Sequence, residues 1–172
     1  PLSVRADVDT LTLVAGLYVR NADVTWRSTV NGMQKLSATG NTDDGSAFNI
    51  DLDGSSPEGT AIKVVSSDAG FITSAFLDLD FIEGGRLDID GTLARDGAPS
   101  RFNIVVMDGR LHNAPFLTQI LSLASLRGLA DTLGGDGVLF SRIDIPLTVA
   151  GDRYVVTGGK AQGPALGLTA NG

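Results

Sequence analysis

Residues 142–149 read Arg-Ile-Asp-Ile-Pro-Leu-Thr-Val, and apolar and polar residues alternate through this stretch without a break. Successive side chains of a β-strand point to opposite faces, so Ile143, Ile145 and Leu147 share one face. A strand with one apolar and one polar face is typical of an antiparallel sheet that has one side in water. This stretch therefore predicts an antiparallel β-structure.

The same period of two recurs at 4–8, 48–53 and 86–90, where apolar residues alternate with polar or charged ones. Short runs of Asn, Asp and Gly, which favour tight turns, separate the alternating segments. These turn signals stand at 31–32, 43–45, 96–97 and 150–152. Alternating segments joined by tight turns predict hairpins between consecutive strands.

Two segments follow the helical period instead. In 68–82, apolar residues recur at three- and four-residue spacing after Asp68, a favourable N-cap. In 113–134, Pro115 stands at a first helical position, and glycines end the segment. We expect five apolar residues of the second helix to be largely buried: Phe116, Leu117, Ile120, Leu121 and Leu129.

Together these patterns predict one domain over residues 1–172, mainly β with two short helices (α+β), because a single core serves a chain of this length. We expect a curved, twisted antiparallel sheet of about eight to ten strands with an apolar concave face. The two helices would pack on that face or cap one end of the sheet.

Charge and composition exclude several classes of protein. The net charge of −7, from 13 basic and 20 acidic residues, argues against binding nucleic acid or an anionic membrane surface. The absence of cysteine excludes disulfides and thiolate metal sites. No apolar run approaches the roughly 18 residues that cross a bilayer. Because the sequence starts at Pro1 without a leader pattern, we expect a piece of a larger protein whose anchor lies outside it.

Candidate catalytic residues are few. The single histidine, His112, cannot form a multi-histidine metal site, and we expect a loop or capping role for it. Asp-x-Asp pairs place two carboxylates about 7 Å apart on a strand, a spacing used by glycosidases and also suited to calcium. Four such pairs occur, which favours the wet face of ordinary strands over one active site. They are Asp7/Asp9, Asp51/Asp53, Asp78/Asp80 and Asp88/Asp90.

The sequence also lacks a phosphate-binding glycine loop and the Gly-x-Ser-x-Gly elbow of many hydrolases. We therefore expect no enzyme activity, no catalytic residue, no metal and no cofactor. A hydrolase that uses one Asp-x-Asp pair stays as a minor hypothesis.

An amphipathic sheet must cover its apolar face, and two short helices need not cover all of it. An uncovered apolar trough would hold acyl chains without any catalytic residue. The residues on the cleanest apolar rows are the candidates for lining such a groove: Leu87, Ile89, Phe102, Ile104, Val106, Ile143, Ile145 and Leu147.

Several short sequence motifs follow one another in a characteristic order in the second part of the chain. The most specific is Leu-His-Asn-Ala-Pro-Phe-Leu at 111–117, followed by Gly-Gly-Asp-Gly-Val-Leu-Phe at 134–140. Ser-Asp-Ala-Gly-Phe-Ile at 67–72, Glu-Gly-Gly-Arg-Leu at 83–87 and Gly-Pro-Ala-Leu-Gly-Leu at 163–168 complete the set. Their order and spacing resemble the C-terminal region of the AsmA-like family of Gram-negative envelope proteins, the AsmA, TamB and YhdP type.

The resemblance implies a large periplasmic protein that an N-terminal helix anchors in the inner membrane. Such proteins have an elongated, curved β-sheet with a hydrophobic groove, and they are implicated in moving phospholipid towards the outer membrane and in outer-membrane assembly. The resemblance supplies no catalytic residue. We expect residues 1–172 to be one segment of such a sheet, with membrane contact only through other parts of the parent.

Two functions therefore follow as expectations. The first is a non-enzymatic segment that handles phospholipid or another acyl-chain lipid between the inner and outer membranes. The alternative is a structural or assembly module for outer-membrane biogenesis, whose groove is closed and whose surface binds other envelope proteins.

Overall fold

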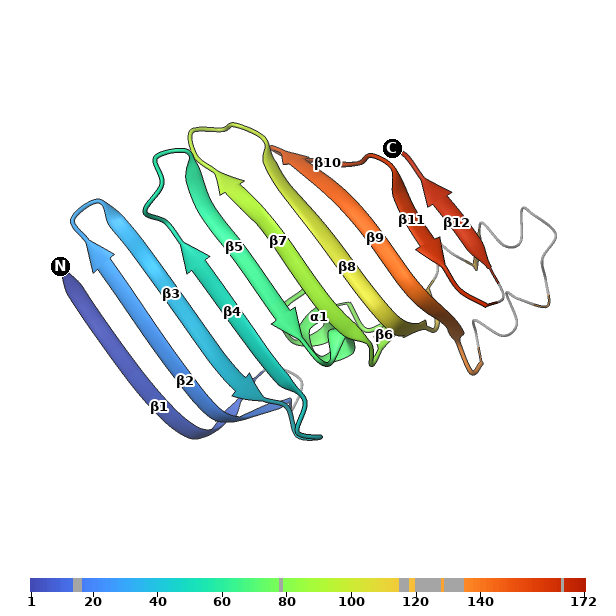
Figure 1. Cartoon of the computed structure of the whole chain (residues 1–172), viewed down its shortest axis with the longest axis horizontal. Coiled ribbons are helices and arrows are strands. Elements are labelled where there is room, and N and C mark those ends of the chain that lie inside the picture. Colours follow the sequence, from blue (N-terminus) through green and yellow to red (C-terminus); the bar gives the residue numbers. More distant parts are fainter. Residues whose placement is uncertain (14–16, 78, 115–117, 120–127, 129–134, 165) are drawn as a thin grey trace.

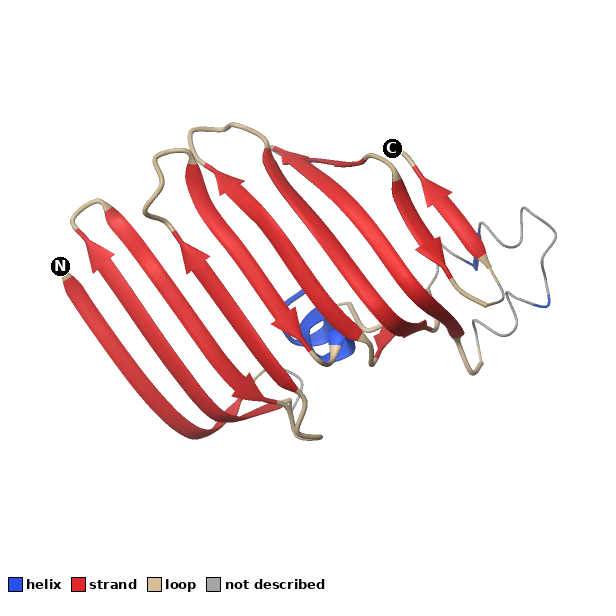
Figure 2. Cartoon of the chain, viewed as in Figure 1, coloured by secondary structure: helices blue, strands red, loops and turns tan. Residues whose placement is uncertain are grey.

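The computed structural model describes residues 1–13, 17–77, 79–114, 118–119, 128, 135–164 and 166–172 (Figure 1). Strands make up 64% of this part of the chain and form one open antiparallel sheet (Figure 2). The predicted mainly β architecture is therefore confirmed. The strands are β1 (Leu2–Thr12), β2 (Tyr18–Thr29), β3 (Gly32–Asn41), β4 (Ala47–Asp53), β5 (Gly59–Ser66), β6 (Ile82–Glu83), β7 (Arg86–Ala94), β8 (Ser100–Leu111), β9 (Val138–Ala150), β10 (Arg153–Val156), β11 (Gly159–Gln162) and β12 (Gly167–Ala170).

The order of the strands in the sheet follows their order in the chain. Ten strands lie on the path β1-β2-β3-β4-β5-β7-β8-β9-β11-β12, and every pairing is antiparallel. Two short strands lie off this path, because β6 pairs with β8 and β10 pairs with β9. The sheet therefore has twelve strands, two more than the upper limit of the expected eight to ten. The two strands off the path, β6 and β10, have two and four residues, which is too few to reveal a strand from a period of two in the sequence.

The predicted turns fall between consecutive strands. The loop between β2 and β3 is Val30-Asn31, one residue earlier than the predicted Asn-Gly turn, because Gly32 already pairs with Thr29. The Asp-Gly turn at 96–97 lies between β7 and β8. Asp96 and Gly97 both have positive φ, at 55° and 75°, as a tight hairpin turn of this type requires. The hairpin prediction is thus confirmed at these positions.

The single helix of the described residues, α1 (Ala69–Leu77), follows β5. Asp68 is its N-cap, as predicted, because its Oδ1 accepts a hydrogen bond from the amide of Phe71 at 3.1 Å. The amides of Ala69 and Gly70 donate to the carbonyls of Gly85 and Gly84, at 2.7 and 3.2 Å. The backbone carbonyls at 84–85 therefore accept hydrogen bonds from the first amides of the helix, which have no partner within the helix itself.

The expected helix over 68–82 is too long. Helix α1 ends at Leu77, and Ile82 belongs to β6, where it pairs with Leu111 of β8. The physical reason is that pairing with β8 gives the backbone at 82–83 a ladder of hydrogen bonds, which outweighs the helical spacing of apolar residues before it.

The second expected helix, over 113–134, falls almost wholly outside the described residues. The five residues expected to be buried there, Phe116, Leu117, Ile120, Leu121 and Leu129, all lie outside them. The described part of the chain therefore contains one helix where two were expected.

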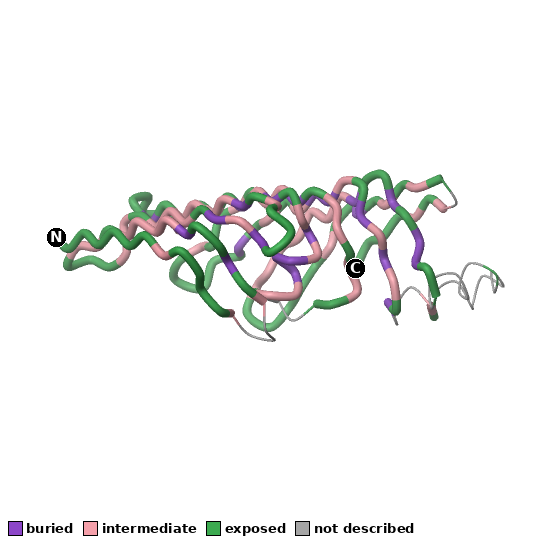
Figure 3. Tube along the Cα trace, turned by 90° about the horizontal axis from the view of Figure 1, so that it is seen from below, coloured by how far each residue is buried: buried purple, intermediate pink, exposed green. Residues whose placement is uncertain are grey.

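The buried apolar residues form one cluster that joins α1 to the sheet. Phe71 and Ile72 of α1 lie in it with Phe48 of β4, Leu87 of β7 and Phe140 of β9. The outer strand β1 contributes no fully buried residue and is exposed along almost its whole length (Figure 3). The core thus lies around α1 and thins out towards β1.

Candidate functional site

The eight candidate lining residues all point to one face of the sheet. Directly paired residues of antiparallel strands share a face, and here the pairing runs across β7, β8 and β9. The residues form three rows, named here by their position relative to α1. The inner row is Leu87, Val106 and Ile143, the middle row is Ile89, Ile104 and Ile145, and the distal row contains Phe102 and Leu147, with Gly91 as their partner on β7.

The three rows differ in burial. Leu87, Val106 and Ile143 of the inner row are buried, with exposed fractions of 1, 2 and 8%. The five other candidates, in the middle and distal rows, are only partly buried. The inner row is therefore part of the core, whereas the five candidates of the middle and distal rows leave part of their apolar surface exposed.

Helix α1 explains the difference between the rows. Phe71 of α1 stacks on Phe48 of β4, which lies on the inner row, with ring centroids 6.2 Å apart. In Figure 1 the helix lies at one end of the strands. It contacts β6 and β8. The helix therefore covers the inner row.

The apolar rows continue through the N-terminal strands. From Phe102 the distal row runs through Ile62, Leu52, Leu36 and Trp26 as far as Val4 of β1. With Val156 of β10 at its other end, this row crosses nine strands. The middle row runs in parallel with it through these five residues: Val64, Ile50, Ala38, Val24 and Ala6.

The alternation at 4–8 and 48–53 predicts that Val4, Ala6, Ile50 and Leu52 lie on one face of their strands, but the lining candidates did not include them. Val24 and Trp26 of β2 were not predicted. The period of two is interrupted just before them, where Asn21 has a φ of 50° and the register of β2 with β3 shifts between Arg20 and Asp23. Such an irregularity moves side chains between faces and interrupts the period of two.

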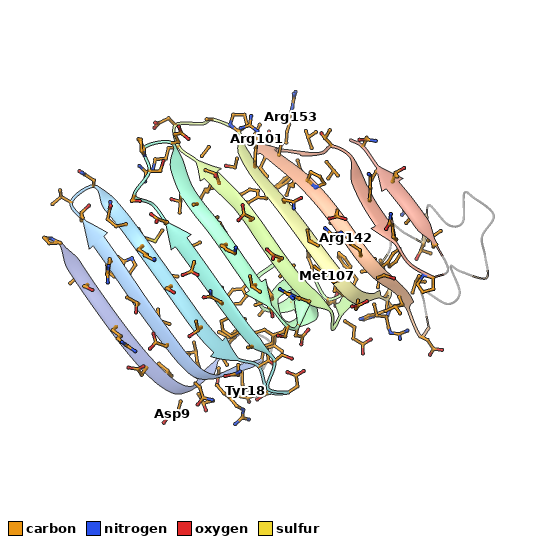
Figure 4. The ribbon with its side chains drawn as sticks, viewed as in Figure 1. Asp9, Tyr18, Arg101, Met107, Arg142 and Arg153 are labelled. Atoms are coloured by element: carbon orange, nitrogen blue, oxygen red, sulfur yellow. The ribbon has the colours of Figure 1, made fainter. Side chains whose placement is uncertain are left out.

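The opposite face of the sheet is polar. Arg142 of β9 makes a double hydrogen bond to the carboxylate of Asp144, at 2.7 Å for each nitrogen. Met107 pairs with Arg142 across β8 and β9, and both lie on this polar face (Figure 4). Asn49 donates to the carboxylate of Asp51 at 2.8 Å. The second face is thus mainly polar, although Val65 and the buried Val105 lie on it between Asn49, Asp88 and Asp144.

The Asp-x-Asp pairs at 7/9, 51/53 and 88/90 alternate with the apolar rows and belong to this polar face. Asp78, of the fourth pair, lies outside the described residues. Among the residues that the structure describes, no group of three or more His, Asp or Glu side chains is placed to hold a metal ion. The pairs are spread along β1, β4 and β7, and the carboxylate of Asp53 accepts hydrogen bonds from Ser55.

His112 borders an open, polar depression of about 580 Å³ at the end of β8. Glu83, Arg110 and Asp136 also line it, and Arg110 donates to the carbonyl of Asp136 at 3.0 Å. The imidazole Nδ1 lies 3.5 Å from the side-chain amide of Asn113. The backbone of His112 donates to the carbonyl of Phe81 at 3.0 Å, so this residue helps to hold the segment before β6 against β8.

Within the described ranges, no helix has the length and apolar character needed to cross a membrane. Comparison with known proteins gives no match to a family model, a curated protein or a solved structure.

Proposed function

We propose that this chain handles acyl-chain lipids on the apolar face of its sheet, without catalysis. The observation that carries the proposal is the distal row, which crosses nine strands from Val4 to Val156 and whose interior members are only partly buried. Except at Gly91, which has no side chain, the row consists of apolar side chains, and such a row forms the kind of surface that a lipid tail covers.

The dimensions of this row suit an acyl chain. Neighbouring strands lie about 4.8 Å apart, so nine strands span roughly 38 Å. A single leaflet of a bilayer has a hydrocarbon thickness of about 15 Å, half that of the bilayer core. One tail would therefore cover only part of the row, and a lipid would have room to shift along it. Each buried methylene contributes about 0.8 kcal/mol, so binding needs no polar contact with the tail.

The groove that we propose is the concave side of this face, with the middle and distal rows as its lining and α1 closing it at the inner row. Ile89, Phe102, Ile104, Ile145 and Leu147 would touch the lipid. Leu87, Val106 and Ile143 would support the groove from the core because they are buried.

The cellular setting is part of the same proposal. The ordered phrases between 67 and 168 resemble the AsmA-like family, which implies a periplasmic segment of a parent that is anchored in the inner membrane. In that setting the lipid would be a phospholipid moving between the inner and outer membranes, and partners would be other envelope proteins.

The single tryptophan makes a direct test possible. Trp26 lies on the distal row, on β2, and is partly buried. Phospholipid with brominated acyl chains should quench its fluorescence if tails lie on this face. A matched variant, Trp26→Phe with Thr25→Trp, moves the indole to the polar face and should lose the quenching. Equal quenching in both proteins would overturn the proposal.

The alternative is a structural or assembly module whose apolar face is covered by protein. The burial of the inner row under α1 favours this alternative. If protein covered the middle and distal rows in the same way, no apolar surface would be left for a lipid. Native mass spectrometry of the purified chain separates the two functions. Co-purifying lipid supports the first, and a lipid-free chain with unquenched Trp26 supports the second.

A further inference from the structure

The apolar face continues for one more row beyond the distal row, towards the end of the strands away from α1, named here the hairpin end. This outermost row is named here the rim row. On β7 and β9 it is apolar, because Leu93 and Val149 continue the alternation of these strands. Between them on β8 lies Ser100, which is buried and pairs with Val149. Apolar side chains therefore reach the hairpin end on β7 and β9.

Towards β1 the rim row is polar. Thr60 of β5 is directly opposite Leu93, and Gln34 of β3 stands two residues before Leu36. The side-chain amide of Gln34 donates to Thr29 Oγ1 at 3.3 Å. Polar side chains thus border the apolar face at β3 and β5, and α1 covers its inner row. The face is open at Leu93, whose exposed fraction is 51%.

An arginine stands beside this opening. Arg95 follows β7 directly, and its Nη2 donates to the carbonyl of Gly54 at 2.7 Å, which holds the guanidinium at the hairpin end. Among the described residues Arg95 has no ion pair, although Asp96 follows it in the chain. A guanidinium has five N–H donors in a planar fork and binds phosphate with two parallel hydrogen bonds. Arg95 is therefore suited to bind an anionic phosphate at this end.

Charge is distributed unevenly between the two ends of the strands. Arg101 and Arg153 lie at the same end as Arg95, together with Asp96 and Asp152 of the turns (Figure 4). At the α1 end, the connections between the long strands have no lysine or arginine at their described positions, with β6 included. They contain these acidic residues: Asp43, Asp44, Asp68, Asp80, Glu83 and Asp136. This distribution favours an anionic group at the hairpin end over the α1 end.

We propose that a lipid on the apolar face binds in one direction, with an anionic phosphate headgroup at Arg95. Its tails would pass over Leu93 onto the distal row, and the headgroup would project past the strand ends into water. Arg101 and Arg153 would add positive potential without direct contact. This inference rests on the proposed lipid function and adds to it the charge and the position of the headgroup.

Fluorescence quenching tests the direction of the lipid. Leu93→Trp and Phe76→Trp, each combined with Trp26→Phe, place a single indole at the hairpin end or on α1. The two positions are matched in exposure, at 51 and 52%. A phospholipid with a nitroxide on its headgroup should quench Leu93→Trp several-fold more strongly than Phe76→Trp. Equal quenching, or stronger quenching of Phe76→Trp, would overturn the direction.

A second lipid separates this inference from the function on which it rests. A phospholipid with brominated tails quenches Trp26 of the parent chain whichever way the lipid points. Quenching of Trp26 without a preference of the headgroup label for Leu93→Trp refutes the direction alone. Absence of quenching by both lipids refutes the lipid function and the direction together.

Loss of charge tests the contact with phosphate. Arg95→Gln keeps an amide donor for Gly54, and we expect it to weaken binding of monomeric diheptanoyl phosphatidylglycerol by about fivefold, the value of an exposed ion pair. Arg86→Gln is the matched control, since Arg86 is exposed at the other end of β7. A diacylglycerol of the same chain length lacks the phosphate and should bind the parent chain and Arg95→Gln equally. Equal affinity of the two variants for the phospholipid would refute the headgroup site.

Discussion

Phe48 of β4 and Phe71 of α1 stack with their ring centroids 6.2 Å apart and their planes inclined by 22°. Both rings are buried, at 7 and 8% exposure. Phe48 lies on the inner row of the sheet, so this stack fixes the helix over that row. It marks the line where the core of the protein ends and the partly exposed apolar face begins.

Removing one ring of this stack should destabilise the domain strongly. We expect Phe71→Ala to lower the free energy of unfolding by about 3 kcal/mol, because a large buried side chain leaves a cavity. Phe76→Ala, on the same helix at 52% exposure, is the control and should cost far less. Urea denaturation followed by circular dichroism measures both, and equal losses would contradict the role given to Phe71.

A carboxylate substituted on different rows should distinguish the buried core from the proposed lipid-binding groove. We expect Ile145→Asp to stay folded and to lose bound lipid, because a charge on the middle row breaks the apolar path. Val106→Asp should unfold the domain, since it buries an unpaired charge at a site that is 2% exposed. Thr148→Asp puts the same charge on the polar face of β9, opposite Arg101, and serves as the control.

Thermal unfolding and lipid content are measured together for these three variants. A folded Ile145→Asp protein with its full load of lipid would rule out this row as part of the groove. Loss of lipid from Thr148→Asp as well would point to a general effect of charge on the sheet.

Two neighbouring glycines should differ in what a methyl group costs. Gly84 and Gly85 both have positive φ, at 58° and 77°, so alanine is strained at either position. A Cβ on Gly84 meets no atom within 4 Å, whereas one on Gly85 would lie 2.8 Å from the Cα of Gly109. We expect Gly84→Ala to cost about 1 kcal/mol and Gly85→Ala clearly more. Equal values from urea denaturation would show that the close approach to β8 is easily relieved.

The turn between β3 and β4 should contribute to stability in a pH-dependent way. Hydrogen bonds from Thr42 and Ser46 to the Asp44 carboxylate lower the pKa of this group from its ordinary 3.8. A lowered pKa in the folded state stabilises the fold above the ordinary value, and this contribution is lost as the pH falls through the folded value. Asp44→Asn should therefore flatten the acid side of the stability profile.

Urea denaturation at a series of pH values from neutral to below 3.8 measures this effect. Ser46→Ala removes part of the hydrogen bonding and should move the acid loss to higher pH. An Asp44→Asn profile that runs parallel to that of the parent chain would contradict the assignment.

The alternation of residues was sufficient to predict the two faces of the sheet. Ile143, Ile145 and Leu147 do share a face with Leu87, Ile89 and Phe102, because antiparallel pairing keeps the period of two in register across strands. Alternation carries no information about what covers a face. Leu87 and Ile89 are two residues apart and equally apolar, yet only Leu87 is buried, and it belongs to the core cluster that contains Phe71 and Ile72 of α1.

The end of α1 was harder to predict for a similar reason. Local spacing in 68–82 favours a helix, but Ile82 pairs with Leu111, a partner 29 positions farther along the chain. The carbonyls of Gly84 and Gly85 also turn back to the first amides of the helix. Contacts at such distance leave no trace in a short window of sequence.

The match between strand order and chain order has a consequence for how the protein folds. From β1 to β5 each strand pairs with the one before it, so every hairpin can form as soon as its two strands have left the ribosome. An open sheet of this kind needs no final strand to close it, and its parts should unfold separately from the edges inwards. Amide exchange should then be fastest in β1 and slowest in β7 and β8, which carry Leu87 and Val106 of the buried inner row.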